Sequence, residues 1–131
     1  MSTMTSVLSH TELPPRSWTF TASSIPPSLN DRLHWRVRAK LNAAVRDEIA
    51  CQVREAHAPM LQRARVTCTL IRNRGREKDL DNSYTSAKAA VDGLTAGGII
   101  ADDDRKHIDL LVTQERGPQR GVRITVEEVT A

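Results

Sequence analysis

The sequence predicts a single α/β domain of the α+β type, in which a small mixed β-sheet packs against two helices in the order β-α-β-α-β-β. Four short segments alternate apolar and polar residues, as strands do, and two longer segments repeat apolar residues at helical spacing. The length of 131 residues suffices for one hydrophobic core but not for two. Aromatic residues make up only 3% of the chain, so we expect an aliphatic core.

The first half of the chain predicts a tail, a strand and a helix. Residues 1–15 are rich in Ser and Thr and end in two prolines, which indicates a flexible tail before a domain that spans residues 16–131. Residues 18–22 alternate and predict the first strand. A helix follows from about residue 36 to residue 57, and Pro59 prevents it from continuing. We expect its inward side to carry Val37, Leu41, Ala44, Val45 and Gln52.

The second half predicts a strand, a second helix and two further strands. Residues 65–72 are rich in β-branched side chains and nearly alternate. The second helix ends at Gly97-Gly98, where glycine lets the chain turn left-handed. Its apolar stripe consists of Tyr84, Ala87, Val91 and Leu94. Residues 108–115 and 122–127 alternate again and predict the last two strands, joined by a turn.

Two groups of carboxylates flank the second helix. Asp79 and Asp81 stand two residues apart before it, and side chains at this spacing point the same way in extended chain. Asp81 or Asn82 then caps the helix. The run Asp102-Asp103-Asp104 follows the helix, and an adjacent return strand would bring it back toward the first pair. Such oxygen ligands suit Mg²⁺ or Mn²⁺. The alternative is a helix cap followed by a solvated polar loop.

A lysine lies on the helix between these groups. Lys88 stands seven residues after Asp81, on the same face of the helix two turns on. A lysine beside carboxylates is what phosphoryl-transfer chemistry uses to stabilise extra negative charge. The alternative is an ordinary ion pair between Lys88 and Asp92, four residues later.

Positive charge gathers before the acidic groups. From Arg32 to Lys78 there are twelve Lys or Arg residues against four Asp or Glu, although the net charge is only +3. A basic face beside an acidic pocket attracts a phosphate backbone, and ordinary solvated surface is the alternative. Trp35 either stacks on an exposed base or anchors its helix to the core. The candidate DNA-binding residues are Asn30, Arg32, Trp35, Arg36, Arg38, Lys40, Arg74, Arg76 and Lys78.

The cysteines and the hydropathy pattern exclude several classes. Cys51 and Cys68 lack metal-binding spacing and lie in apolar contexts, which indicates reduced core residues of a cytoplasmic protein. No apolar run approaches the length that spans a membrane, and the start of the chain lacks the layout of a signal peptide. A glycine loop for nucleotide phosphates is also missing, so we expect neither a membrane partner nor a nucleotide cofactor.

The chain resembles the RusA-type Holliday junction resolvases over residues 18 to about 128, with agreement in order and spacing. The shared core elements are Asp79-Leu80-Asp81-Asn82, Lys88, Asp92-Gly93-Leu94, Gly98 and Asp102-Asp103, and an earlier element is Pro26-Pro27-Ser28-Leu29-Asn30. The resemblance implies that Asp79, Asp81, Asp103 and Lys88 are the catalytic residues. It also implies that the three aspartates bind Mg²⁺, for which Mn²⁺ can substitute.

Two departures from the family leave the register of the site open. The family lysine often follows the second aspartate by about one helical turn, whereas about two turns separate Lys88 from Asp81. Either residues 83–85 are an insertion that starts the helix later, or Lys88 is displaced. The run of three aspartates also leaves the third ligand open among Asp102, Asp103 and Asp104.

The resemblance implies a Mg²⁺-dependent endodeoxyribonuclease that resolves four-way DNA junctions, or Holliday junctions, by paired symmetric phosphodiester hydrolysis in recombination and repair. Two symmetric cuts imply a homodimer with a twofold axis. One rival hypothesis keeps the nuclease but replaces the junction with replication forks, flaps or phage DNA intermediates. A rival from another class is a non-catalytic DNA-binding protein whose acidic cluster is structural.

Overall fold

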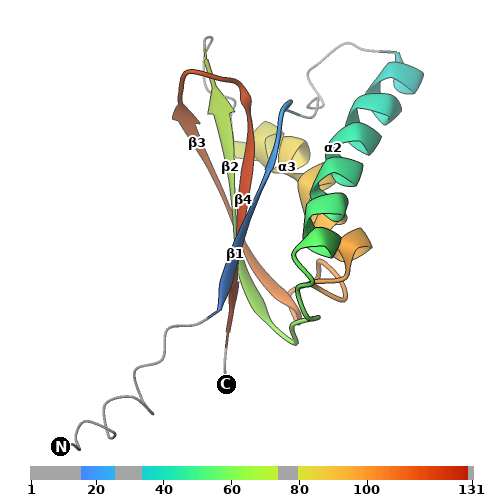
Figure 1. Cartoon of the computed structure of the whole chain (residues 1–131). Coiled ribbons are helices and arrows are strands. Elements are labelled where there is room, and N and C mark those ends of the chain that lie inside the picture. The colour runs from blue at the N-terminus through green and yellow to red at the C-terminus, as the bar shows by residue number, and fades with distance from the viewer. Residues whose placement is uncertain (1–15, 26–33, 74–79, 130–131) are drawn as a thin grey trace, which may run out of the picture.

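The domain has the predicted order of elements, β-α-β-α-β-β (Figure 1). A computed structural model describes residues 16–25, 34–73 and 80–129, and the side chains of residues 80–82 lie outside the description. The expected tail of residues 1–15 lies outside the described residues as well. The elements are β1 (Ser17–Ala22), α2 (Trp35–Glu55), β2 (Ala64–Arg72), α3 (Leu80–Gly97), β3 (Ile108–Arg116) and β4 (Gly121–Glu128).

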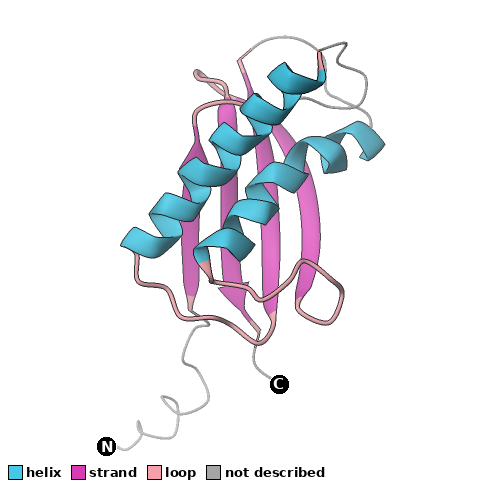
Figure 2. Cartoon of the chain, turned by 90° about the vertical axis from the view of Figure 1, so that its right-hand side faces the viewer, coloured by secondary structure: helices cyan, strands magenta, loops and turns pink. Residues whose placement is uncertain are grey.

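The four strands form one mixed sheet in the order β1-β4-β2-β3. β2 and β3 are parallel, with Ala64 opposite Ile108, and α3 is the crossover between them. β4 pairs antiparallel with both β1 and β2. Both helices cover the same face of the sheet (Figure 2). The parallel crossover returns the chain from the end of α3 to the start of β3, which places the loop of residues 101–107 beside the helix.

The core is aliphatic, as predicted. The largest fully buried side chains are Ile, Leu and Val residues from both helices and from β2 and β4, with Ile99 and Ile100 from the turn after α3. Phe20 is the one aromatic side chain among the buried core residues that the structure describes. The predicted stripe of α3 is confirmed, because Ala87, Val91 and Leu94 are buried and Tyr84 packs partly buried against the core.

The two helices run parallel and approach each other closely at two glycines. A Cβ atom at Gly93 would lie 2.7 Å from the carbonyl oxygen of Arg46, and one at Gly97 would lie 2.6 Å from Cβ of Val53. The contact points therefore follow the same order in both helices: Gly93 lies against Arg46, and Gly97 lies against Val53, further along α2. Since real Cβ atoms do not approach other atoms so closely, glycine at these positions is what allows the backbones to meet. The N-terminal ends of α2 and α3 lie at the same end of the domain (Figures 1 and 2).

The predicted inward side of α2 is wrong in its first half. Val37 and Leu41 are 46% and 38% exposed, and Ala44 is exposed too. Packing is confined to the later turns, where Val45, Ile49 and Val53 are fully buried. Gln52 faces inward as predicted: its side-chain amide donates to the carbonyl oxygen of Thr21 and accepts from the Thr21 N–H. Cys51 on the same helix is exposed, so its expected place in the core is also wrong, whereas Cys68 is buried.

Helix α3 starts earlier than predicted. It begins at Leu80, so Asp81 and Asn82 lie inside its first turn rather than at its cap. The extended-chain argument therefore does not apply to Asp81. Residues 83–85 are also helical, which rules out the hypothesis that they delay the start of the helix. The end of the helix is as predicted, because Gly98 has a φ of 93° and its N–H donates to the carbonyl oxygen of Leu94.

Candidate functional site

Lys88 and Asp103 form the centre of the candidate site. The Lys88 Nζ atom lies 3.5 Å from a carboxylate oxygen of Asp103 and 3.5 Å from one of Asp92. Asp92 stands one turn after Lys88 on α3, whereas Asp103 comes from the loop that follows the helix. The charge of Asp92 and then that of Asp103 raise the pKa of Lys88, against the effect of partial burial. Lys88 thus makes the expected ion pair with Asp92 and also contacts Asp103 of the acidic run, and its catalytic role stays a prediction.

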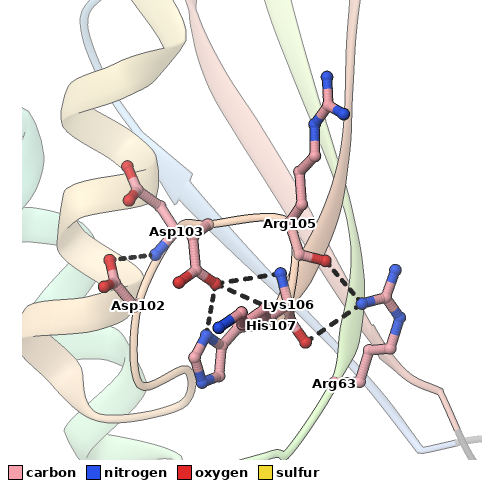
Figure 3. Close-up of polar contacts among 7 residues, drawn as sticks. Arg63, Asp102, Asp103, Arg105, Lys106 and His107 are labelled. Carbon is pink, nitrogen blue, oxygen red and sulfur yellow. Dashed lines mark hydrogen bonds and ion pairs between the residues drawn. The ribbon is translucent and has the colours of Figure 1, made fainter.

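The three aspartates of the loop have different roles in the structure (Figure 3). The Asp102 carboxylate accepts a hydrogen bond from the Asp103 N–H at 2.7 Å. The Asp104 carboxylate accepts from the N–H groups of Lys106 and His107 at 3.1 and 3.2 Å, and lies 2.5 Å from His107 Nδ1. The contact with His107 holds the pKa of Asp104 below its ordinary value. Asp102 and Asp104 therefore shape the loop, and Asp103 is the aspartate directed at Lys88.

Arg63 fixes the other side of the same loop. Its Nη1 atom donates to the carbonyl oxygens of Arg105 and Lys106 at 2.7 and 3.1 Å, as Figure 3 shows. Its Nη2 atom donates to the Asp109 carboxylate at 2.7 Å. One guanidinium thus links the loop backbone to Asp109, the second residue of β3. Such charge-assisted bonds are stronger than neutral ones. The loop is therefore held by Arg63 on one side and by the carboxylates of Asp102 and Asp104 on the other.

A cavity of about 640 Å³ opens beside this loop. Its charged lining comes from Arg63, Asp103, Arg105 and Asp109. Tyr84 lines it from α3, and the Tyr84 hydroxyl lies 3.5 Å from the carbonyl oxygen of Leu110. Ile108 and Leu110 complete the wall. A second cavity of about 710 Å³ lies between the β3–β4 turn and the end of β1, and none of the predicted site residues line it.

The other two predicted metal ligands are described only in part. Asp79 lies outside the described residues, and of Asp81 the structure describes the backbone, in the first turn of α3. Helix geometry places Asp81 on the same face as Lys88, about 10 Å away along the axis. The described side chains, which exclude those of Asp79 and Asp81, contain no group of three or more His, Cys, Asp or Glu residues that could hold a metal.

The predicted DNA-binding residues fall into two sets. Trp35 is 66% exposed, which excludes the hypothesis that it anchors α2 to the core. Its ring stacks on His34 and lies 5.3 Å from the Arg36 guanidinium carbon. Lys40 is exposed and Arg38 is half-buried on the same helix. The remaining predicted residues, Asn30, Arg32, Arg74, Arg76 and Lys78, lie outside the described residues.

Of the residues that line the cavity, the sequence predicted only Asp103 as part of the site, and Tyr84, Arg63 and Arg105 are among those it did not indicate. Tyr84 matched the apolar stripe of α3, so its second role beside Asp103 had no separate signal. Arg63 and Arg105 are 42 residues apart and meet only because β2 and β3 are parallel neighbours. The basic pair Arg105-Lys106 directly after the acidic run was the one available sign that the loop carries both charges.

Comparison with known protein families found no family that matches this chain, and no characterised protein is significantly similar to it. Of the helices that the structure describes, neither has the length and apolar character needed to span a membrane.

Proposed function

We propose that this protein is a Mg²⁺-dependent endonuclease that cuts branched DNA, with the four-way junction as its substrate. The main support is the contact between Lys88 and Asp103, at the edge of a cavity that also contains arginine. A carboxylate that binds a metal and a cation that stabilises phosphate charge can act together in phosphodiester hydrolysis. The resemblance in sequence to the RusA-type resolvases supplies the junction as the substrate.

The donor set fits the proposed metal. Asp79, Asp81 and Asp103 would provide only carboxylate oxygens, which Mg²⁺ and Mn²⁺ prefer. When bound, the metal would supply an activated water and charge stabilisation. The ammonium group of Lys88, already positive beside Asp103, would add a positive charge near the phosphate. Asp102 and Asp104 hold the loop so that the Asp103 carboxylate stays directed at Lys88.

A homodimer is part of the proposal. Resolution of a four-way junction requires two symmetric cuts, and a twofold axis supplies two equivalent sites. Light scattering of an active sample should therefore report a particle of twice the 14.6 kDa chain mass. A monomer at micromolar concentration in an active sample would contradict this part.

The decisive experiment compares a synthetic four-way junction with a fork, a flap and linear duplex, each with Mg²⁺, with Mn²⁺, with Ca²⁺ and with chelator. We expect cleavage of the junction with Mg²⁺ or Mn²⁺, and none with Ca²⁺ or chelator. Cleavage of forks or flaps in preference to junctions would support the nuclease activity but show that the junction is not the preferred substrate. Binding without cleavage under every metal would favour a DNA-binding protein whose Asp103 serves only as an ion-pair partner of Lys88.

A further inference from the structure

Arg105 combines a fixed backbone with an unused side chain. Its carbonyl oxygen is held by Arg63, and the neighbouring N–H groups are held by Asp104. Among the described residues, the structure gives the Arg105 guanidinium no hydrogen bond or ion pair. Figure 3 shows this side chain extending away from Arg63. The contacts that hold the loop in place therefore do not involve the Arg105 guanidinium. This group remains available to a ligand.

The other cations around the cavity already have anionic partners. Arg63 is paired with Asp109 at 2.7 Å, and Lys88 with Asp92 and Asp103. The His107 ring contacts Asp104. Arg105 is therefore the cation of this lining whose head group has no anionic partner among the described residues. A guanidinium with free N–H groups at a cavity wall is suited to bidentate binding of a phosphate.

The remaining lining restricts the kind of phosphate. The single Lys88 ammonium faces both Asp92 and Asp103, so negative charge remains in excess beside the cavity, and a doubly charged free phosphate is repelled more strongly than a singly charged phosphodiester. Ile108, Leu110 and the Tyr84 ring provide apolar surface, which suits the sugar of a nucleotide rather than a bare ion. The volume of about 640 Å³ exceeds what a single phosphate fills. These features fit a nucleic-acid strand that passes through the cavity.

We propose that Arg105 binds a backbone phosphate of a nucleic-acid strand lying in the cavity beside Asp103, and that Arg63 is the positioning residue that holds Arg105 in place. The identification of that strand as DNA rests on the proposed nuclease function. The contact itself needs neither metal nor cleavage, so it can be measured separately.

The test is an NMR titration of the full chain with the thymidine trinucleotide TpTpT in the presence of chelator. Shifts of Ile108, Leu110 and Tyr84 resonances report binding in the cavity. Arg105→Ala should weaken the affinity about tenfold, the value of one charged hydrogen-bonded pair, and Arg105→Lys should weaken it less. Arg120→Ala is the matched control, because Arg120 is exposed and lies past the opposite end of β3. It should leave the affinity in the cavity unchanged.

Two further probes identify the ligand chemistry. A methylphosphonate analogue of the trinucleotide, which lacks the charge, should bind wild type and Arg105→Ala equally weakly. Inorganic phosphate should bind more weakly than TpTpT. Unfolding temperatures of the variants, compared with wild type, show that each variant is folded.

The inference is overturned if wild type does not bind TpTpT, if the shifts lie outside the cavity, or if Arg105→Ala binds as tightly as wild type. Junction cleavage, measured in parallel with Mg²⁺, separates the two proposals. If the protein binds TpTpT through Arg105 but cuts no junction, the phosphate contact is supported and the nuclease proposal is wrong. If the protein cuts junctions but its Arg105→Ala variant binds TpTpT as tightly as wild type, only the proposed phosphate contact is wrong.

Discussion

The loop after α3 and the first two turns of α2 are two exposed surfaces built in opposite ways. The loop of residues 102–107 is held by Arg63, by the carboxylates of Asp102 and Asp104 and by backbone bonds. The start of α2 exposes Trp35, Val37 and Leu41, and packing begins only near Val45. A site that must hold a carboxylate in one position needs a loop fixed by hydrogen bonds, as after α3. A surface that adapts to a partner can instead consist of loosely packed side chains, as at the start of α2. This difference agrees with the proposal, in which the loop carries the chemistry and the start of α2 contacts the DNA.

The largest expected effect is on the chemistry. Asp103→Asn should lower junction cleavage by at least about a hundredfold, because the carboxylate proposed to bind the metal is lost. The unfolding temperature should stay near that of wild type, since the Asp103 side chain is 40% exposed. Asp102→Asn is the matched control and should retain most of the cleavage, because its side chain can still accept the Asp103 N–H. Equal losses of cleavage in both variants would mean that Asp103 acts only by maintaining the conformation of the loop and not by binding a metal.

The start of α2 should show the opposite behaviour. Trp35→Ala should weaken junction binding about tenfold, since stacking of one base on an aromatic ring is worth about 1–3 kcal/mol. Its free energy of unfolding should change by no more than about 0.5 kcal/mol, because the side chain is largely exposed. Gel shift in chelator and urea denaturation measure the two quantities. Trp18→Ala, which removes a ring packed against the core, should instead lower stability. Unchanged junction binding in Trp35→Ala would remove this residue from the interface.

A smaller effect is expected on stability when Arg63, which holds the loop backbone, is replaced. Arg63→Met should lower the free energy of unfolding by about 1–2 kcal/mol, because it deletes hydrogen bonds to two carbonyl groups and a carboxylate. The amides of Lys106 and His107 should exchange with solvent faster. Arg65→Ala, an exposed residue on β2, should cost less than about 0.5 kcal/mol. If both variants are equally stable, the loop is not held from this side.

The smallest effect is the acid sensitivity of the loop. The contact with His107 depresses the pKa of Asp104 in the folded protein below its ordinary value of 3.8. The stabilisation is therefore complete above that pH and is lost as the pH falls through the depressed value. The amide resonances of Lys106 and His107 should titrate with a midpoint below 3.8, and Asp104→Asn should abolish this step. A midpoint at or above 3.8 would contradict the pairing.

The sequence predicted the parts of the fold that depend on local pattern. Alternation and helical spacing gave every element in order, and Gly98 gave the left-handed end of α3. The start of α2 misled because Val37 and Leu41 continue the apolar spacing of Val45 although the helix packs only further along. Exposed apolar residues of a helix can have the same periodicity as its core residues, so spacing alone could not separate them.

The candidate site was predictable only where its residues are close in sequence. The proximity of Lys88 to the acidic run followed from the return of the chain after α3, and the structure places Asp103 there. The roles of Asp102 and Asp104 depend on hydrogen bonds that three consecutive aspartates do not reveal. Arg63 meets Arg105 through the parallel pairing of β2 with β3, which is a property of the sheet and not of any local pattern.

The parallel course of the two helices has an electrostatic consequence. Each helix carries a macrodipole equivalent to roughly half a positive charge at its N-terminus. Because α2 and α3 point the same way, these partial charges add at the end of the domain where Trp35 and Asp81 lie. In antiparallel helices they would have opposed each other. If the proposed DNA strand binds at this end, the positive field of the two helix backbones would attract its phosphates and would partly offset the repulsion by the aspartates.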